Sequence, residues 1–228
     1  MALTPAPALL ERVRGDFTRF VTDARYPCLG ARAALRRGGC RIAVYGPMGT
    51  DATTTALAAD LAAFGGAGES GASPFVAFVA MFLEAAPPSE LAFEAALWRQ
   101  LTMLGAVDET TRWADGVSDD PDDPHFAFSF AGHALFVIGM HPESSRLARR
   151  LAWPTLVFNP HAQFRRLRAE GRFEGLRRAI RTRDAALQGS VNPNLADAGE
   201  RSEARQYSGR PTDDAWRCPF HRDHPADA

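Results

Sequence analysis

Lysine is absent from this sequence, because all 26 basic residues among its 228 are arginine. Chemistry that needs a lysine, such as Schiff-base formation, is therefore excluded. Cysteine is scarce: Cys28, Cys40 and Cys218 show no spacing typical of a disulfide framework or a zinc motif. No apolar run approaches the roughly 18 residues that span a bilayer, and the first residues lack the apolar stretch of a secretory signal. We expect a cytoplasmic protein.

Net charge is also small, at −1 near pH 7, which gives no overall attraction to nucleic acid or to a membrane. We therefore expect neither as a partner, and a homodimer remains open. Hydrophobic residues make up 46% of the chain, which is enough for a real core. We expect a single domain over residues 1–220, with a frayed tail at 221–228.

The hydrophobic pattern predicts an α+β fold with a central, mostly antiparallel sheet flanked by helices. Short runs rich in aromatic and β-branched residues predict strands at 40–45, 74–83, 126–130, 134–140 and 154–158. Apolar residues at helical spacing predict helices at 8–22, 28–37, 51–64 and 162–183, and one that starts near Pro87. Gly171 is expected to break or kink the last of these.

The segment 126–150 changes abruptly from two predicted strands, paired as a hairpin, to a basic turn. His141 follows the second strand directly. A short helix is expected after it, whose first N–H groups would be free to bind an anion. Three guanidinium groups belong to this turn, those of Arg146, Arg149 and Arg150. A potential metal ligand beside several cations, directly after a buried strand, is the composition of a pocket floor.

A second histidine, His161, follows the next predicted strand. A single histidine is more often a hydrogen-bonded structural residue, but two after neighbouring strands, with arginines nearby, favour one shared site. Glu94 lies beside the apolar stripe of its helix. A carboxylate there either pairs with an arginine or receives a cationic ligand.

Residues 188–220 are polar and irregular, yet aromatic residues persist among them. Such a segment is costly to order unless it packs, so we expect a lid folded over the pocket rather than a disordered tail. The polar residues concerned are Asn192, Asn194, Glu203, Arg205, Gln206, Tyr207 and Arg210.

Three other motifs have simpler structural interpretations. Cys28 opens a predicted helix, where its thiol pKa could be lowered, but a small buried cysteine is the commoner case. The turn 46–50 resembles a phosphate-binding loop only weakly, since its glycine spacing is wrong and lysine is missing. The acidic stretch 113–124 lacks the pattern of a calcium loop and is better explained as a solvated loop.

Several motifs together resemble the YqcI/YcgG family. They keep the family's order from Tyr26 to Phe220: YPCLGARAAL, FEAALWRQL, SDDPDDPHFAFSF, GMHPESSRLARR, FNPHAQFRRLR, IRTRDAALQGSVNPNL, SEARQYSGR and CPF. Members of known activity are heme proteins that hydroxylate a guanidine nitrogen. The resemblance implies a heme-dependent oxidoreductase, with heme b (iron) as cofactor, that acts on a small guanidine or amine. It would use peroxide, or dioxygen with an external electron donor.

Heme needs an axial ligand, an apolar slot and cations for its propionates. On this resemblance we expect His141 as the iron ligand, with His161 as the alternative or distal partner and Cys28 as a weaker candidate. The three arginines of the basic turn would pair with propionates, or with a substrate carboxylate. The slot would be lined by Phe136, Ile138, Phe158 and Phe164.

Glu94 is the first choice for holding a cationic substrate over the heme, with further contacts from the lid residues Asn192, Glu203, Tyr207 and Arg210. Two alternatives stay open. One is a non-heme iron enzyme that uses His141, His161 and a carboxylate, either Asp197 or Glu203. The other is a non-catalytic heme carrier or sensor.

Overall fold

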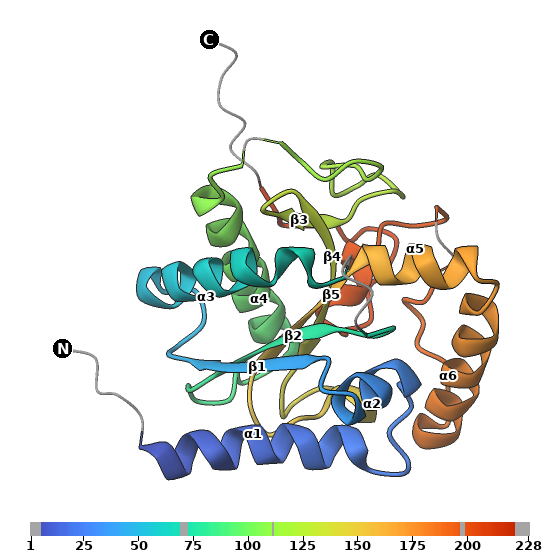
Figure 1. Ribbon diagram of the computed structural model, residues 1–228, viewed down its shortest axis with the longest axis horizontal. Helices are drawn as coiled ribbons and strands as arrows, with labels where there is room; N and C mark the ends of the chain where they lie inside the picture. The colour runs from blue at the N-terminus through green and yellow to red at the C-terminus, as the bar shows by residue number, and fades with distance from the viewer. Residues whose placement is uncertain (1–5, 69–72, 111, 197–198, 222–228) are drawn as a thin grey trace.

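The computed structural model describes residues 6–68, 73–110, 112–196 and 199–221. Its centre is a five-stranded sheet in the order β1-β2-β5-β4-β3 (Figure 1). The strands are Cys40–Tyr45 (β1), Ala77–Phe82 (β2), Phe128–Phe130 (β3), His133–Met140 (β4) and Thr155–Pro160 (β5). β1 and β2 pair in parallel, and the other three pairings are antiparallel. The prediction of an α+β fold with a mostly antiparallel sheet is confirmed.

Helices cover both faces of the sheet (Figure 1). Pro7–Thr22 (α1) and Leu29–Arg36 (α2) pack on one face, where Val13, Phe17 and Val21 meet the alternate residues of β2. Asp51–Phe64 (α3) and Glu90–Val107 (α4) pack on the other, over a larger aromatic core. Since β2 is buried on both faces, its continuous apolar run is explained.

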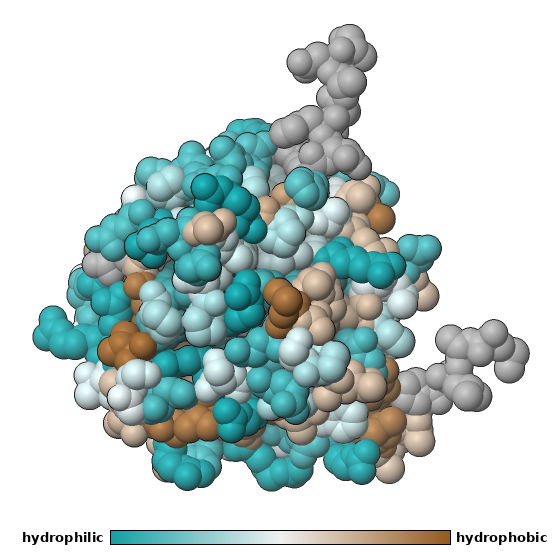
Figure 2. Space-filling view, turned by 180° about the vertical axis from the view of Figure 1, so that it is seen from behind, coloured by the Kyte–Doolittle hydropathy of each residue, from teal (hydrophilic) through white to brown (hydrophobic). Residues whose placement is uncertain are grey.

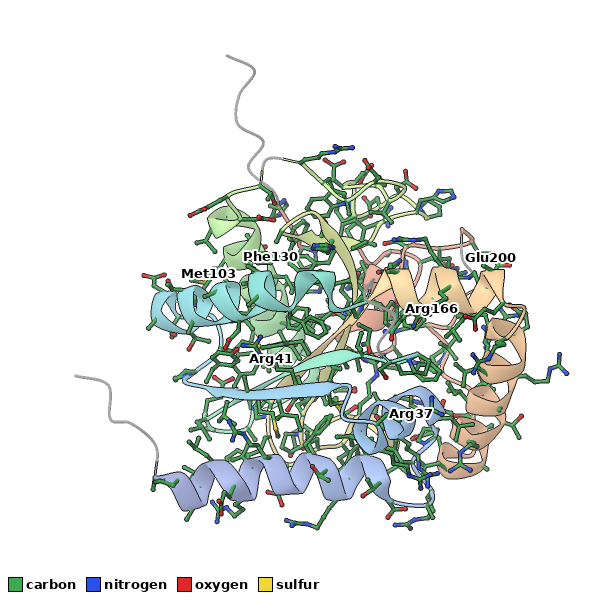
Figure 3. The ribbon with its side chains drawn as sticks, in the orientation of Figure 1. Arg37, Arg41, Met103, Phe130, Arg166 and Glu200 are labelled. Atoms are coloured by element: carbon green, nitrogen blue, oxygen red, sulfur yellow. The ribbon has the colours of Figure 1, made fainter. Side chains whose placement is uncertain are left out.

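The long predicted helix at 162–183 is two helices, His161–Ala169 (α5) and Phe173–Gln188 (α6). Gly171 lies between them with φ +67°, a left-handed conformation that glycine adopts without strain, so the predicted break is confirmed. Arg166 lies on α5 (Figure 3). Its guanidinium donates to the carbonyl oxygens of Ser73 and Pro74, which holds the chain that leads into β2.

The helix predicted after His141 is wrong. The segment forms only a 3₁₀ turn of three residues, Leu147–Arg149 (η2), with irregular chain on both sides of it. Its N–H groups are also taken: the Ser145 N–H donates to a carboxylate oxygen of Glu90 (2.9 Å), and the Leu147 N–H donates to Gln188 Oε1 (2.7 Å). This turn therefore offers no helix start to an anion.

The carboxy-terminal segment is ordered and packs against the sheet, which agrees with the expectation of a packed segment rather than a disordered tail. Its short helix Ala204–Tyr207 (α7) packs against β4, and Trp216 and Phe220 join the aromatic core around Trp98. Residues 222–228, where a frayed tail is expected, and Asp197 lie outside the described residues.

The turn between β1 and α3 is structural. The N–H of Gly49, in the left-handed region with φ +74°, donates to Gln100 Oε1 (2.8 Å), and the Gln100 amide donates to Thr54 Oγ1 (2.9 Å).

The surface seen from behind is mostly hydrophilic, with apolar residues scattered between polar ones (Figure 2). Across the described part of the chain, the search for a helix with the length and apolar character of a membrane span finds none.

Candidate functional site

His141 is the centre of the candidate site. It follows β4 directly, and its backbone N–H donates to the carbonyl of Arg149 (3.0 Å), which closes the turn around it. The imidazole is completely buried and stacks on the ring of Phe93 from α4, with ring centroids 4.2 Å apart and planes inclined by 20°. Within the described residues, neither ring nitrogen has a hydrogen-bond partner.

An unpaired buried polar group is unusual, since it costs about 1–3 kcal/mol of folding free energy. Burial also lowers the pKa of His141 to about 4, so the ring is neutral at pH 7. A neutral imidazole with a free lone pair is the form that binds a metal ion. His141 therefore has the chemistry of a metal ligand, although no other described protein group touches its nitrogens.

The close approach of Phe93 depends on Gly139, two residues before His141. A Cβ atom at position 139 would lie 2.6 Å from Phe93 Cε1 and 2.9 Å from the carbonyl oxygen of Tyr207. Glycine thus lets α4 and the carboxy-terminal segment both press on the end of β4. The sequence Gly139-Met140-His141 builds the wall behind the imidazole.

The three predicted propionate partners make internal contacts. Arg146 pairs with Asp184 of α6 and also donates to Ser190. Arg149 donates to the carbonyls of Tyr207 (2.9 Å) and Gly139 (3.3 Å), and Arg150 Nε donates to the Ser144 carbonyl (2.8 Å). Desolvation lowers the pKa of Arg149 to about 10, which still leaves it charged at pH 7. These arginines order the turn around His141, and Arg146 is neutralised by its partner.

His161 does not share a site with His141. β4 and β5 are antiparallel, with Leu135 opposite Pro160 and Met140 opposite Thr155, so the two histidines lie at opposite ends of the sheet. At about 3.4 Å per residue, the separation is about 20 Å. The prediction of one site containing both is wrong, and with it the distal role of His161 and the iron site built from both histidines.

His161 belongs instead to a network that holds the carboxy-terminal segment. Its Nε2 lies 3.1 Å from Glu203 Oε1, which also accepts a hydrogen bond from the Tyr207 hydroxyl. The same hydroxyl accepts the N–H of Phe128 (3.0 Å) in the hairpin. Glu203 and the Tyr207 hydroxyl, predicted as substrate contacts, thus tie α7 to the sheet.

The predicted aromatic slot is not formed. Phe158 lies opposite Val137 and shares its face of the sheet, whereas Ile138 points to the other face, because successive strand residues alternate. Phe136 packs edge-on against Phe164 and Tyr207. These four side chains therefore do not line a common cleft.

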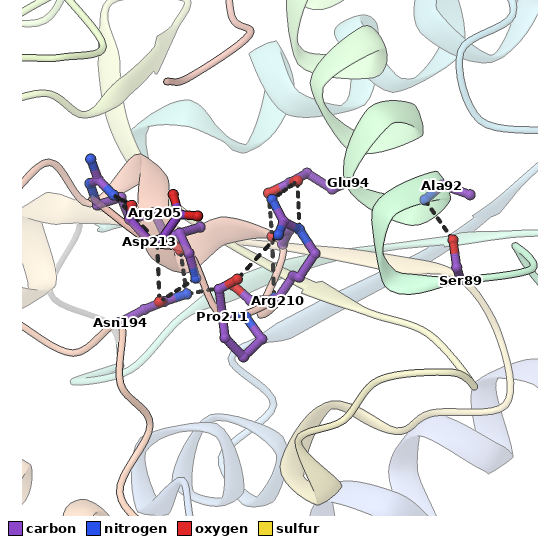
Figure 4. A network of polar contacts seen from close by, with 10 residues as sticks. Ser89, Ala92, Glu94, Asn194, Arg205, Arg210, Pro211 and Asp213 are labelled. Atoms are coloured by element: carbon purple, nitrogen blue, oxygen red, sulfur yellow. Dashed lines mark hydrogen bonds and ion pairs between the residues drawn. The ribbon is translucent and has the colours of Figure 1, made fainter. Parts of the chain in front are cut away.

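The Glu94 carboxylate is buried, and of the two predicted partners, an arginine or a cationic ligand, the structure shows an arginine. Arg210 Nε and Nη2 both donate to Glu94 Oε2, at 2.8 and 2.6 Å, and the Ser208 hydroxyl donates to Oε1 at 3.0 Å (Figure 4). The segment that brings Arg210 here is held by Asn194, whose amide donates to the carbonyls of Arg205 and Arg210. Asn192 accepts the N–H of Asn194 and shapes the same turn.

Glu94 also lines a hollow of about 410 Å³ on the outer side of α4. Its walls are mostly apolar, and its other polar members are Arg99, Thr102 and His221. Sequence reasoning missed this hollow and the role of Ser208. The sequence contains the motif Tyr207-Ser208-Gly209-Arg210, but nothing in its neighbouring residues indicates that it contacts a helix more than a hundred residues earlier.

Cys28 is the N-cap of α2, where its sulfur accepts the N–H of Ala31 at 3.4 Å. Burial raises the pKa of the thiol, which agrees with the preferred structural interpretation of Cys28 and not with a thiol activated by the helix start. Cys28 is a structural cap in this conformation.

Comparisons with known proteins give one relative and one family. The chain is 25% identical over 211 residues to a Bacillus subtilis (strain 168) protein named "Uncharacterized protein YqcI", covering 87% of this chain and 81% of that protein. No solved structure matches significantly. The model of the YqcI/YcgG family matches residues 17–221, which include every candidate site residue named above. This chain belongs to the YqcI/YcgG family.

Proposed function

We propose that this protein is a heme-dependent oxygenase that hydroxylates a nitrogen of a small guanidine or amine. The observation that carries the proposal is the imidazole of His141: buried, neutral and without a partner on either nitrogen. Family membership supports it, because the resemblance implies the same cofactor and reaction.

His141 fits the role of an iron ligand, on the condition that the enclosing segment moves. His141 would hold the iron through a ring nitrogen, while Phe93 fixes the ring plane. Arg149 and Arg150 are the nearby cations for propionates once they release main-chain carbonyls. Because the imidazole is fully enclosed and Gly209 packs on the side chain of Arg149, residues 207–210 must move before a porphyrin can reach it.

The protein's own contribution to the reaction is binding and orientation. When bound, heme supplies an iron centre that activates peroxide or dioxygen. Glu94 would hold the substrate cation by charge-assisted hydrogen bonds, as it now holds the Arg210 guanidinium. The carboxylate thereby fixes which substrate nitrogen faces the oxidising centre. The complete burial of His141 excludes water from its imidazole.

The test is a hemin titration of the wild type and of two histidine variants, followed by the visible absorption band of bound heme. We expect His141→Ala to lose the band and His161→Ala to keep it, since the two side chains lie at opposite ends of β4. Both variants remove an imidazole after a strand, so each controls for the other. Unchanged heme binding by His141→Ala would refute the assignment.

Turnover separates the enzyme from a heme carrier or sensor. Heme-loaded protein is incubated with L-arginine and peroxide, or with dioxygen and a chemical reductant, and the product is analysed for an N-hydroxyguanidine. A protein that binds heme through His141 but forms no hydroxylated product from any guanidine or amine offered would be a carrier or a sensor.

A further inference from the structure

Glu94 and its neighbours form a binding site whose shape suits a guanidinium group. One of its oxygens accepts two N–H bonds from the same guanidinium, at 2.8 and 2.6 Å, and the other accepts the Ser208 hydroxyl at 3.0 Å. Only 4% of Glu94 is exposed. A buried carboxylate needs a cation and several hydrogen-bond donors. Here the planar Arg210 guanidinium supplies the cation and two donors, and the Ser208 hydroxyl supplies a third donor.

The cation bound to Glu94 is the guanidinium of Arg210, and this side chain makes few other contacts. Arg210 follows α7, and its side chain is 26% exposed, compared with 6% for the Glu94 side chain. Apart from Glu94, its guanidinium bonds only to the neighbouring Pro211 carbonyl (3.2 Å) within the described chain. The guanidinium can therefore leave the binding site toward solvent without breaking other long-range contacts of its own.

A hollow on α4 lies beside this carboxylate, because Glu94 is part of its lining. Its volume of about 410 Å³ is in the usual range of ligand pockets, about 300–1,000 Å³. Glu94 is its acidic member, Trp98 and Met103 give it apolar walls, and Arg99 lies five residues further along α4. At 1.5 Å per residue, Glu94 and Arg99 are separated by about 7.5 Å along the helix axis. That spacing suits a ligand with a guanidinium at one end and a carboxylate at the other.

We propose that Glu94 and Ser208 form a binding site for a small guanidino acid, and that the chain's own Arg210 occupies this site until the ligand replaces it. The inference rests on the proposed function for the identity of its ligand as the substrate. It adds the place of binding, the requirement for an acidic group on the ligand, and an internal competitor. Because Arg210 must be displaced, the apparent affinity of the wild type equals the intrinsic affinity multiplied by the fraction of molecules in which Arg210 has left the site.

Binding to heme-free protein tests the proposal, so the result does not depend on the cofactor. Calorimetric titration with 4-guanidinobutyrate, and with methylguanidine as the minimal probe, is done on the wild type and on Arg210→Ala. We expect the variant to bind both at least about tenfold more tightly, because the competitor is gone. Methylguanidine should also raise the melting temperature of Arg210→Ala, and 4-aminobutyrate should do neither.

Arg146→Ala is the matched control. Arg146 and Asp184 form a second buried arginine–carboxylate pair, with side chains 6% and 13% exposed, and neither residue lines the hollow. We expect methylguanidine to bind this variant no better than the wild type. Adding Glu94→Gln to Arg210→Ala should abolish binding, and Arg99→Gln should weaken 4-guanidinobutyrate but not methylguanidine.

Equal rescue of both arginine variants would mean that methylguanidine merely fills any vacated arginine cavity, and would overturn the proposal. So would the absence of saturable binding to Arg210→Ala. If that variant does not fold, Arg210→Lys keeps the charge but loses the fork, and should likewise bind methylguanidine more tightly than the wild type. Guanidine binding without heme binding would refute the proposed function alone, and heme binding without guanidine binding would refute this inference alone.

Discussion

At His141, burial sets the protonation state and leaves two nitrogens without partners at the same time. A structural histidine normally donates one N–H to a carbonyl or carboxylate, as His161 contacts Glu203. This contrast supports the proposed ligand role of His141 and indicates a structural role for His161. It depends on their surroundings, because both follow a strand in similar sequence contexts.

The lowered pKa of His141 predicts that the free energy of unfolding decreases as the pH is lowered. The folded-state pKa is about 4 and the unfolded value about 6.5, so the unfolded state binds more protons as the pH falls below 6.5. We expect a loss of about 2 kcal/mol in unfolding free energy between pH 7 and pH 5, measured by urea denaturation. His141→Phe should remove this part of the pH dependence. An identical slope in the variant would show that other groups cause it.

At the scale of elements, α4 supplies three different functions from one helix. Phe93 faces His141, Glu94 faces Arg210, and Gln100 reaches the turn before α3. The helix can approach β4 so closely only because Gly139 has no side chain. A change at this contact should therefore affect the candidate ligand through the helix.

Gly139→Ala tests that contact. Its Cβ would need to displace Phe93 and Leu97, whose nearest atoms would lie 2.6 and 2.9 Å away. We expect a loss of roughly 1–3 kcal/mol in stability and weaker heme binding, because the ring behind His141 shifts. Thermal unfolding and the hemin titration measure the two effects. Gly175→Ala, where a Cβ meets nothing within 4 Å, is the control.

Gln100→Leu tests the turn between β1 and α3. The substitution leaves the Gly49 N–H and the Thr54 hydroxyl without their buried partner, which should cost at least about 1–3 kcal/mol of unfolding free energy. Heme binding should not change, since Gln100 bonds to Gly49 and Thr54 and not to the residues around His141. Val107→Thr, at an exposed position of the same helix, should change stability by no more than about 0.5 kcal/mol.

At the scale of the whole molecule, the carboxy-terminal segment connects the two ends of the sheet. Glu203 contacts His161 near one end of β4, and the Tyr207 carbonyl and Ser208 lie near the other. A change in this segment therefore reaches both histidines. Its aromatic residues also complete the core, so it is a part of the domain and not an appended lid.

Tyr207→Phe tests this connection. The hydroxyl that joins Phe128, Glu203 and α7 would be lost, and we expect the free energy of unfolding to fall by roughly 1–3 kcal/mol. If Tyr207 were instead a substrate contact, the variant would keep its stability and bind substrate more weakly. Tyr26→Phe is the control, because no described group bonds to the Tyr26 hydroxyl, and it should be close to neutral.

Sequence alone was enough for the elements and for several of their ends. The strand at 40–45, the helix at 51–64, the break at Gly171 and the packed carboxy-terminal segment all follow from hydrophobic period and turn chemistry, which act over a few residues. It also indicated His141 and Glu94 as unusual residues. Local patterns report what a segment is, because they reflect which of its faces is buried.

Only the tertiary structure decided which residues meet. Whether β4 and β5 pair in parallel or antiparallel is not written in either strand, and the antiparallel choice sent His141 and His161 to opposite ends. The partner of Glu94 is 116 residues away at Arg210. Such contacts depend on how the whole chain satisfies its buried groups at once, so no single segment can specify them.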